Sequence, residues 1–249
     1  MWVHIHKSMG TSVYSLSEMS GENVVRLSFN GNWWPHDTPD GSKKPINCGK
    51  RNYDFVWSNA IWGQIENRHD DQGICHEDFN NGTLLRDPNE CVISKASKEA
   101  YSEVETIASL SCLEVVPATD ARNEASPTKK HWKLRRFWDN FLVRTLGGEE
   151  VWPLPAGGVT ELRAQKVIER LSKFDAVLFV KDFEHKAYLE SAIGWNLEHY
   201  DKAYKRLSDH VVELTTEQDA QVRRTNMFDY IVLDHFRSIP MRERVHKFQ

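Results

Sequence analysis

The chain has 249 residues, 40% of them hydrophobic and 27% charged, as expected for a globular protein large enough to bury one substantial core. Its 32 basic and 36 acidic residues give a formal net charge of -4, which argues against a general binder of nucleic acid or of membrane surfaces. The four cysteines, at positions 48, 75, 91 and 112, form no CxxC pair, so the sequence predicts neither a zinc site nor a disulfide framework. We expect a single domain over residues 1–249.

The first predicted element is a short strand that runs into a glycine-containing turn. Val3 and Ile5 alternate with two histidines, as in a strand, and the residues that follow are rich in hydrogen-bond donors. Gly10 allows a sharp turn, and a helix starting at residues 11–12 would direct its unpaired N–H groups and positive dipole end back into that turn. Lys7 adds a full positive charge. The turn therefore favours a phosphate or sulfate ligand, with an ordinary strand–turn–helix and a solvated lysine as the alternative.

Between this turn and the next clear strand, the sequence predicts few regular elements. We expect a second strand over residues 23–29, a loop over residues 30–51, a short strand over residues 53–57 and a helical turn or short helix over residues 58–67. A loop of this length inside a compact domain is usually functional. Residues 69–78 are dense in histidine and carboxylate side chains, but their spacing fits no standard ligand set, so no metal site is predicted.

A second anion-binding pattern begins where an apolar strand over residues 83–85 delivers Arg86. Pro88 suits the first turn of a helix, because its missing N–H would have no partner there, and apolar residues at helical spacing continue to about residue 110. Ser94 follows eight residues after Arg86, a spacing that can place both side chains on one anion. A surface arginine beside a capped helix start is the alternative interpretation.

The C-terminal half is predicted to contain four helices and one strand. The apolar run at residues 176–180 is bounded by charges, as is typical of a buried parallel strand. Helices that alternate with apolar strands, with a phosphate turn after the first strand, predict an α/β fold of three layers, α/β/α, with a central parallel sheet and ligands at the carboxyl ends of its strands. The predicted helices cover residues 132–146, ending at Gly147 and Gly148, residues 160–171 with Thr160 as the cap, residues 182–193 and residues 216–237.

The first motif, HxxKxxGTS, resembles the 5′-phosphosulfate loop of sulfotransferases that use 3′-phosphoadenosine-5′-phosphosulfate (PAPS), with His6 in place of a proline and Met9 in place of a small residue. The second motif, RDPxxxxxS, is similar to the segment in which the same family holds the 3′-phosphate of the donor through an arginine and a serine, here Arg86 and Ser94. Cys91 stands where Golgi members often carry a further arginine. The two motifs follow one another in the order that the family shows.

Further stretches extend the resemblance over nearly the whole chain. Asn140 and Arg144 match an NxxxRxLxG pattern of carbohydrate-type sulfotransferases, and we interpret Arg144 as a structural ion-pair partner rather than a ligand contact. The segment FDAVLFVKDFEHKAYLESAIGW, residues 174–195, also resembles the C-terminal half of the family. So do three residues near the end of the chain, Asn226, Asp229 and Tyr230.

This resemblance implies a P-loop-like sulfotransferase fold and transfer of a sulfuryl group from PAPS to a hydroxyl or amine of an acceptor, with no metal. Lys7 would stabilise the leaving oxygen, and a general base ahead of the second motif would take the acceptor proton. Glu66 and His69 are the leading candidates for that base, followed by His76 and then His36. The implied donor-binding residues are Lys7, Ser8, Met9, Gly10, Thr11, Ser12, Arg86 and Ser94.

Three other functions remain open at the level of sequence. The chain could sulfate a hydroxyl of a glycan, act as a nucleotide-dependent kinase with a divergent phosphate loop, or bind ligands on the same scaffold without catalysis. The GxxxxGK[ST] loop of nucleotide triphosphatases is absent at the first motif, because the lysine there precedes the glycine.

The composition of the region between the two motifs indicates which chemical class of acceptor the protein would favour. Four tryptophans, at positions 33, 34, 57 and 62, suit a core but could also line an acceptor site, and four acidic residues follow at positions 70, 71, 77 and 78. This composition favours a small cationic or polyhydroxylated acceptor over a polyanionic glycan. No apolar run approaches the roughly 20 residues needed to cross a bilayer and no signal peptide is evident, so we expect a cytoplasmic location, or the Golgi lumen if the chain is a domain of an anchored protein.

Overall fold

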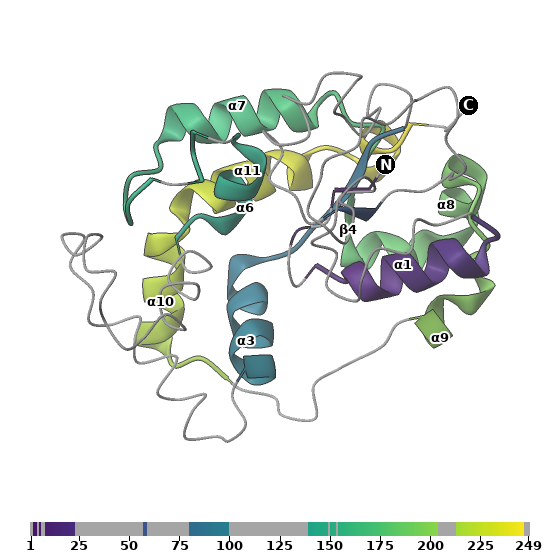
Figure 1. The fold of residues 1–249 in the computed structure, drawn as a ribbon, viewed down its shortest axis with the longest axis horizontal. Helices are drawn as coiled ribbons and strands as arrows, with labels where there is room; N and C mark the ends of the chain where they lie inside the picture. Colours follow the sequence, from purple (N-terminus) through teal and green to yellow (C-terminus); the bar gives the residue numbers. More distant parts are fainter. Residues whose placement is uncertain are drawn as a thin grey trace, which may run out of the picture.

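The structure is a computed structural model, and it describes residues 2–3, 5, 8–22, 57–58, 80–99, 139–148, 150–152, 154–203 and 213–246. Within these residues the protein has a mixed α/β fold, in which a small parallel sheet lies among helices (Figure 1). This confirms the predicted α/β class and parallel sheet. The strands are β1 (Trp2–Val3), β2 (Trp57–Ser58), β3 (Gly82–Leu85) and β4 (Ala176–Phe179). The helices are α1 (Gly10–Met19), α3 (Pro88–Glu99), α6 (Phe141–Leu146), α7 (Glu161–Leu171), η3 (Val180–His185), α8 (Lys186–Ile193), η4 (Leu197–His199), α9 (Tyr200–Ala203), α10 (Thr216–Thr225), α11 (Met227–Ser238) and α12 (Met241–Arg244).

The described sheet has the strand order β2-β1-β3-β4, and each neighbouring pair is parallel. β1 and β3 are fixed in register where Val3 lies beside Thr83, whose hydroxyl also donates a hydrogen bond to the Val3 carbonyl at 2.8 Å. One pair earlier, Gly82 lies beside Trp2, and a Cβ at Gly82 would come within 2.6 Å of the Trp2 ring. The packing of the first strand therefore requires glycine at this position.

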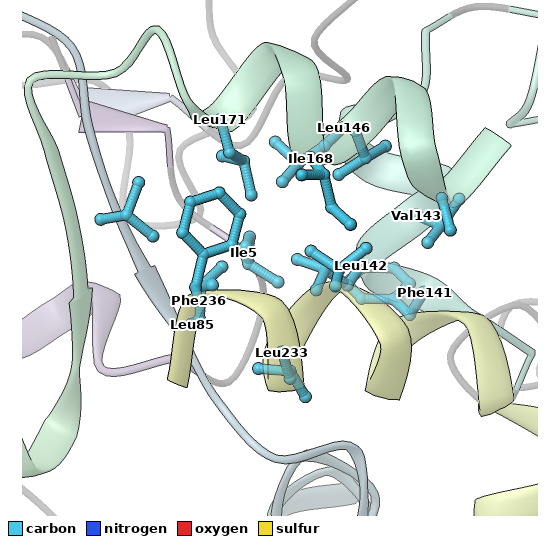
Figure 2. Close-up of a cluster of buried hydrophobic side chains, with 14 of the residues drawn as sticks. Ile5, Leu85, Phe141, Leu142, Val143, Leu146, Ile168, Leu171, Leu233 and Phe236 are labelled. Carbon is cyan, nitrogen blue, oxygen red and sulfur yellow. The ribbon is translucent and has the colours of Figure 1, made fainter. Parts of the chain in front are cut away.

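Side chains of the strands alternate between two hydrophobic clusters, as the period of two in a β-strand requires. Leu85 of β3 packs into one cluster and Leu84 into the other, and β4 alternates in the same way. The first, which we call the α7 cluster and part of which is shown in Figure 2, comprises Val3, Ile5, Leu85, Phe141, Leu142, Val143, Leu146, Val151, Val159, Ala164, Val167, Ile168, Leu171, Phe174, Val177, Phe179, Val232, Leu233 and Phe236. The second, which we call the α1 cluster, comprises Trp2, Val13, Leu16, Leu84, Ala176, Leu178, Phe183, Leu189, Ala192, Ile193, Trp195, Leu197 and Val245.

The predicted strands at the two motifs and at residues 176–180 are present, with boundaries shifted by one or two residues. β1 covers only Trp2–Val3, so Ile5, which the alternating pattern includes in the strand, lies beyond it, and β4 ends at Phe179 because the chain turns into the 3-10 helix η3. The predicted short strand at residues 53–57 shares only Trp57 with β2, and residues 53–56 lie outside the described residues. Residues 23–29 and 59–67, where a strand and a short helix are predicted, lie outside the described residues.

Two predicted helices are wrong in extent. The helix predicted over residues 216–237 is divided into α10 and α11 at Asn226, because the side chain of Asn226 bonds across to another segment. Of the helix predicted over residues 132–146, the described part begins only at Phe141, because Asn140 before it has a left-handed backbone with φ of 52°. Residues 132–138 lie outside the described residues.

Two further helix predictions are partly confirmed. The predicted helix over residues 182–193 is the 3-10 helix η3 followed by α8. α7 begins directly after Thr160, as predicted, but the Thr160 side chain makes no capping hydrogen bond. α3 is described to Glu99, and the predicted continuation to residue 110 lies outside the described residues.

Among the helices that the structure describes, none is both long and apolar enough to cross a membrane.

Candidate functional site

The two predicted anion-binding motifs start at the same edge of the sheet. β1 and β3 are adjacent and parallel, so their carboxyl ends point in one direction, the edge at which open α/β sheets bind ligands. The chain leaves β1 through Ser8 into α1, and it leaves β3 through Arg86 into α3. The hydroxyl of Ser8 lies against the thiol of Cys91 in the first turn of α3. Segments about 80 residues apart in the sequence thus meet at the start of two helices.

The turn before α1 is held by backbone hydrogen bonds and by one left-handed residue. Ser8 N–H donates to the carbonyl of Ile5 at 3.1 Å, and Met9 has φ of 54° and ψ of 23°. The Met9 carbonyl then accepts hydrogen bonds from Ser12 at 2.9 Å and Val13 at 3.0 Å, which starts the helix. Sequence reasoning assigned the sharp turn to glycine, but here a residue with a side chain adopts the left-handed conformation, which ordinarily costs about 1–2 kcal/mol.

Ser8 presents a polar atom that no described residue satisfies. The residue is completely buried, and its hydroxyl has no hydrogen-bond partner in the part of the chain that the structure describes. The Cys91 thiol is close enough to interact with this hydroxyl but forms no hydrogen bond with it, and burial raises the pKa of the thiol to about 12, so the thiol stays neutral. A buried hydroxyl without a hydrogen bond costs about 1–3 kcal/mol, and no described group offsets this cost at Ser8.

Arg86 is oriented by the helix that it precedes. Its Nε donates to the Glu90 carboxylate at 2.9 Å, and the side chains are 26% and 58% exposed, so the pair contributes little to stability. Ser94 lies four residues beyond Glu90, and residues four apart share one side of a helix. The predicted arginine and serine therefore lie along one side of α3, with a carboxylate between them that sequence reasoning did not include.

Asp87 has a structural role. One of its carboxylate oxygens accepts from the N–H of Asn89 at 3.0 Å, which caps α3, and from the hydroxyl of Tyr230 at 2.8 Å. The other accepts from Arg237 at 3.1 Å. Pro88 is the first residue of α3, as predicted. Asp87 thus fixes the start of α3 to α11, and burial together with this hydrogen bond raises the pKa of Tyr230.

A buried polar junction joins α6 to the break between α10 and α11. The Asp229 carboxylate accepts from the backbone N–H groups of Leu142 and Val143, each at 2.9 Å. Two asparagine side chains bridge the same junction: the Asn226 side chain accepts from Asn140 N–H at 2.9 Å, and the Asn140 side chain accepts from Phe228 N–H at 2.9 Å. Burial raises the pKa of Asp229 to about 7, against the effect of its two backbone donors.

Arg144 is the structural ion-pair partner that the sequence predicts. It is 1% exposed, pairs with the Asp139 carboxylate and donates to the carbonyls of Leu154 at 2.7 Å and Pro155 at 2.9 Å. These bonds hold the loop between α6 and α7. Arg144 is therefore fully engaged within the protein, and nothing about its position makes it a ligand contact.

Several predicted site residues lie outside the described residues. They are Lys7 and the four candidate bases, Glu66, His69, His76 and His36. Gly10 and Thr11 are described only as the first backbone residues of α1, whereas Ser12 is buried in the same turn. The site that can be described thus consists of Ser8, Met9 and Ser12 before or within α1, of Arg86 before α3 and of Ser94 on α3.

Comparisons of this chain with protein-family models, with curated proteins and with solved structures find no match.

Proposed function

We propose that the protein transfers a sulfuryl group from PAPS to a hydroxyl or amine of a small acceptor. One observation carries this proposal: the two anion-binding motifs, distant in sequence, begin at neighbouring parallel strand ends and touch where Ser8 lies against Cys91. A donor that carries a phosphosulfate and a separate 3′-phosphate needs two anion sites of this kind. As part of the proposal, the fold is the three-layer, P-loop-like fold of PAPS-dependent sulfotransferases.

The described residues fit the donor. The turn at Ser8 leads directly into α1, and the first N–H groups of a helix lack intrahelical acceptors and attract anions. Arg86 and Ser94 lie along one side of α3 and suit the 3′-phosphate, because guanidinium groups pair strongly with phosphate oxygens. The Glu90 carboxylate would hold the guanidinium in place while a phosphate binds.

The reaction requires positioning and charge neutralisation. The acceptor oxygen or nitrogen forms a bond to sulfur while the bond from sulfur to the 5′-phosphate oxygen breaks, and adenosine 3′,5′-diphosphate leaves. Lys7 and the first backbone N–H groups of α1 would neutralise charge that develops on the leaving oxygen, whereas the N–H groups of Ser8 and Ser12 already donate to the carbonyls of Ile5 and Met9. Glu66 or His69 would accept the proton that the acceptor loses.

The proposal is tested by binding of adenosine 3′,5′-diphosphate and by transfer of labelled sulfate from PAPS to a panel of small amines and alcohols. Arg86→Ala should weaken diphosphate binding about tenfold or more, because it removes charge-assisted hydrogen bonds. Ser8→Ala should weaken binding as well, yet leave the ligand-free protein equally or more stable, since the hydroxyl has no partner there. The matched control is Arg163→Ala, which removes a partly exposed arginine of α7 that is paired with Glu150.

Unchanged diphosphate affinity in both Arg86→Ala and Ser8→Ala would contradict the proposal. Magnesium-dependent binding of ATP in preference to the diphosphate would indicate a kinase instead. Binding of the diphosphate without transfer to any acceptor would indicate a binding module on the same scaffold.

A further inference from the structure

Glu90 places a carboxylate directly beside the arginine of the proposed 3′-phosphate site. Its Oε2 accepts a hydrogen bond from the Arg86 Nε at 2.9 Å, and Arg86 is the only hydrogen-bond partner of this carboxylate among the described residues. The Glu90 side chain is 58% exposed, and a carboxylate can accept about four hydrogen bonds. The group beside Arg86 can therefore accept a hydrogen bond from a ligand as well as from the protein.

This carboxylate works against the binding of a phosphate that has no neighbouring donor. The positive charge of Arg86 is paired with the negative charge of Glu90, so the two side chains are neutral as a unit. Glu90 also lies in the first turn of α3, where it offsets the positive end of the helix dipole. A phosphate bound at Arg86 would lie close to a like charge, which lowers its affinity.

A hydroxyl group next to the phosphate removes this conflict. It can donate to the Glu90 carboxylate while the phosphate oxygens accept from the guanidinium, which has further N–H groups besides Nε. The 3′-phosphate of a ribonucleotide has such a neighbour, because the 2′-hydroxyl is on the adjacent carbon of the ribose. Dinucleotide-binding α/β folds likewise use a carboxylate to accept from a ribose hydroxyl. Arg86 and Glu90 together thus match a phosphate with a vicinal hydroxyl better than a phosphate alone.

We infer that Glu90 recognises the ribose 2′-hydroxyl of the donor, so that the site selects ribonucleoside 3′-phosphates over their 2′-deoxy analogues. Because Arg86 is taken as the group that binds the 3′-phosphate, this inference rests on the proposed function. A glutamate that only oriented Arg86 would affect both kinds of nucleotide equally. Glu90 as a specificity-determining residue affects the ribonucleotide alone, apart from the repulsion that its charge exerts on both.

Calorimetric titration of the full chain with adenosine 3′,5′-diphosphate and with 2′-deoxyadenosine 3′,5′-diphosphate tests this inference. The wild type should bind the ribonucleotide about tenfold more tightly, because a hydrogen bond to a charged group is lost in the deoxy form. In Glu90→Ala this preference should fall to about twofold or less, and the deoxy form should bind at least as tightly as it does to the wild type. Glu90→Gln keeps a neutral acceptor and should show an intermediate preference.

The matched control is Glu150→Ala, which removes a carboxylate that is also 58% exposed and also paired with an arginine, Arg163, away from the proposed site. It should leave the affinities for both diphosphates unchanged. Equal binding of the two diphosphates by the wild type would overturn the inference. So would an equal preference for the ribonucleotide in wild type and Glu90→Ala, which would assign recognition of the hydroxyl to another group.

The same titrations separate this inference from the proposed sulfuryl transfer. A preference for the ribonucleotide that depends on Glu90, in a protein that transfers no sulfate to any acceptor, would support the inference and contradict the proposed reaction. Transfer from PAPS without any preference for the 2′-hydroxyl would support the reaction and overturn the inference. Binding of neither diphosphate by the wild type would overturn both.

Discussion

Asp229 is a buried carboxylate whose charge the fold tolerates at a cost. It is 2% exposed, and burial raises its pKa from 3.8 to about 7, although the N–H groups of Leu142 and Val143 favour the charged form. Its immediate charged neighbours are Asp139, which raises the pKa further, and Arg144, which lowers it. The protonation of a single side chain is thus coupled to the junction that holds α6 against α11.

This coupling predicts a pH dependence of stability. The folded protein retains the Asp229 proton up to about pH 7, whereas the unfolded chain releases it near 3.8, so the stabilisation from this group is complete below about pH 4 and is lost as the pH rises to about 7. The loss should be about 1 kcal/mol per pH unit. Urea unfolding of the wild type and of Asp229→Asn at several pH values measures it, because the variant lacks this titration.

The difference in unfolding free energy between wild type and Asp229→Asn should therefore shrink as the pH rises from about 4 to about 7. A constant difference over this range would mean that the backbone donors keep Asp229 ionised. The control is Asp234→Asn, an exposed carboxylate on the same helix, for which the difference should not vary in this way.

At the level of single residues, the sequence predicted the role of a residue more reliably where its interaction partner is close to it in the chain than where the partner is distant. Pro88 at the start of a helix and Arg144 as an ion-pair partner are both confirmed, and the partner of Arg144 is five residues away. Glu90 beside Arg86 was missed, although an i, i+4 pair is readable from sequence alone. The contact of Ser8 with Cys91 depends on which strands are neighbours, and no local pattern contains that information.

At the level of elements, α3 carries most of what the site requires. Arg86 directly precedes it and Ser94 lies on it, Cys91 faces Ser8, and Asn89 and Ile93 line a pocket against α10. Its position depends on Asp87, which caps it and ties it to α11 through Tyr230 and Arg237. The start of this helix should therefore be sensitive to a residue that touches no ligand.

Replacing Asp87→Ala removes the cap and the partner of the Tyr230 hydroxyl. We expect the free energy of unfolding to fall by about 2 kcal/mol, measured by urea unfolding. A double-mutant cycle with Tyr230→Phe should give a coupling energy of about 1 kcal/mol for the hydrogen bond at 2.8 Å. The control Asp201→Ala removes a carboxylate that is 82% exposed and should change stability by less than about 0.5 kcal/mol. Additive effects of Asp87→Ala and Tyr230→Phe would show that this bond does not hold α3.

Element boundaries were the least predictable part of the fold. The α10–α11 break and the late start of the described part of α6 share one cause, since the Asn226 side chain bonds to the backbone of Asn140 and the Asn140 side chain bonds to the backbone of Phe228, the second residue of α11. A helical pattern of apolar residues runs through both places, and only the tertiary contact ends it. The buried pair of Asp182 with Arg244, at 2.9 and 3.1 Å, likewise fixes the end of β4 to α12, a helix that the sequence did not predict.

At the level of the whole molecule, the parallel sheet was predictable because its strands are short apolar runs with helices between them. The strand order was not, because it depends on packing such as that of Trp2 on Gly82. The sheet also connects the two hydrophobic clusters, because adjacent residues of one strand pack into different clusters. Leu84 and Leu85 are adjacent in β3 and completely buried, yet one belongs to the α1 cluster and the other to the α7 cluster.

Because adjacent residues of the same strands enter both clusters, we expect the described fold to unfold as one cooperative unit. Leu84→Ala and Leu85→Ala should each lower the free energy of unfolding by about 2–5 kcal/mol, since each leaves a cavity in a cluster with no solvent access. In urea, far-ultraviolet circular dichroism and tryptophan fluorescence should give one common midpoint for each variant. The exposed Leu162 provides the control, and Leu162→Ala should leave that midpoint nearly unchanged. If Leu84→Ala instead separates the two signals into distinct transitions, the clusters unfold independently and the sheet does not couple them.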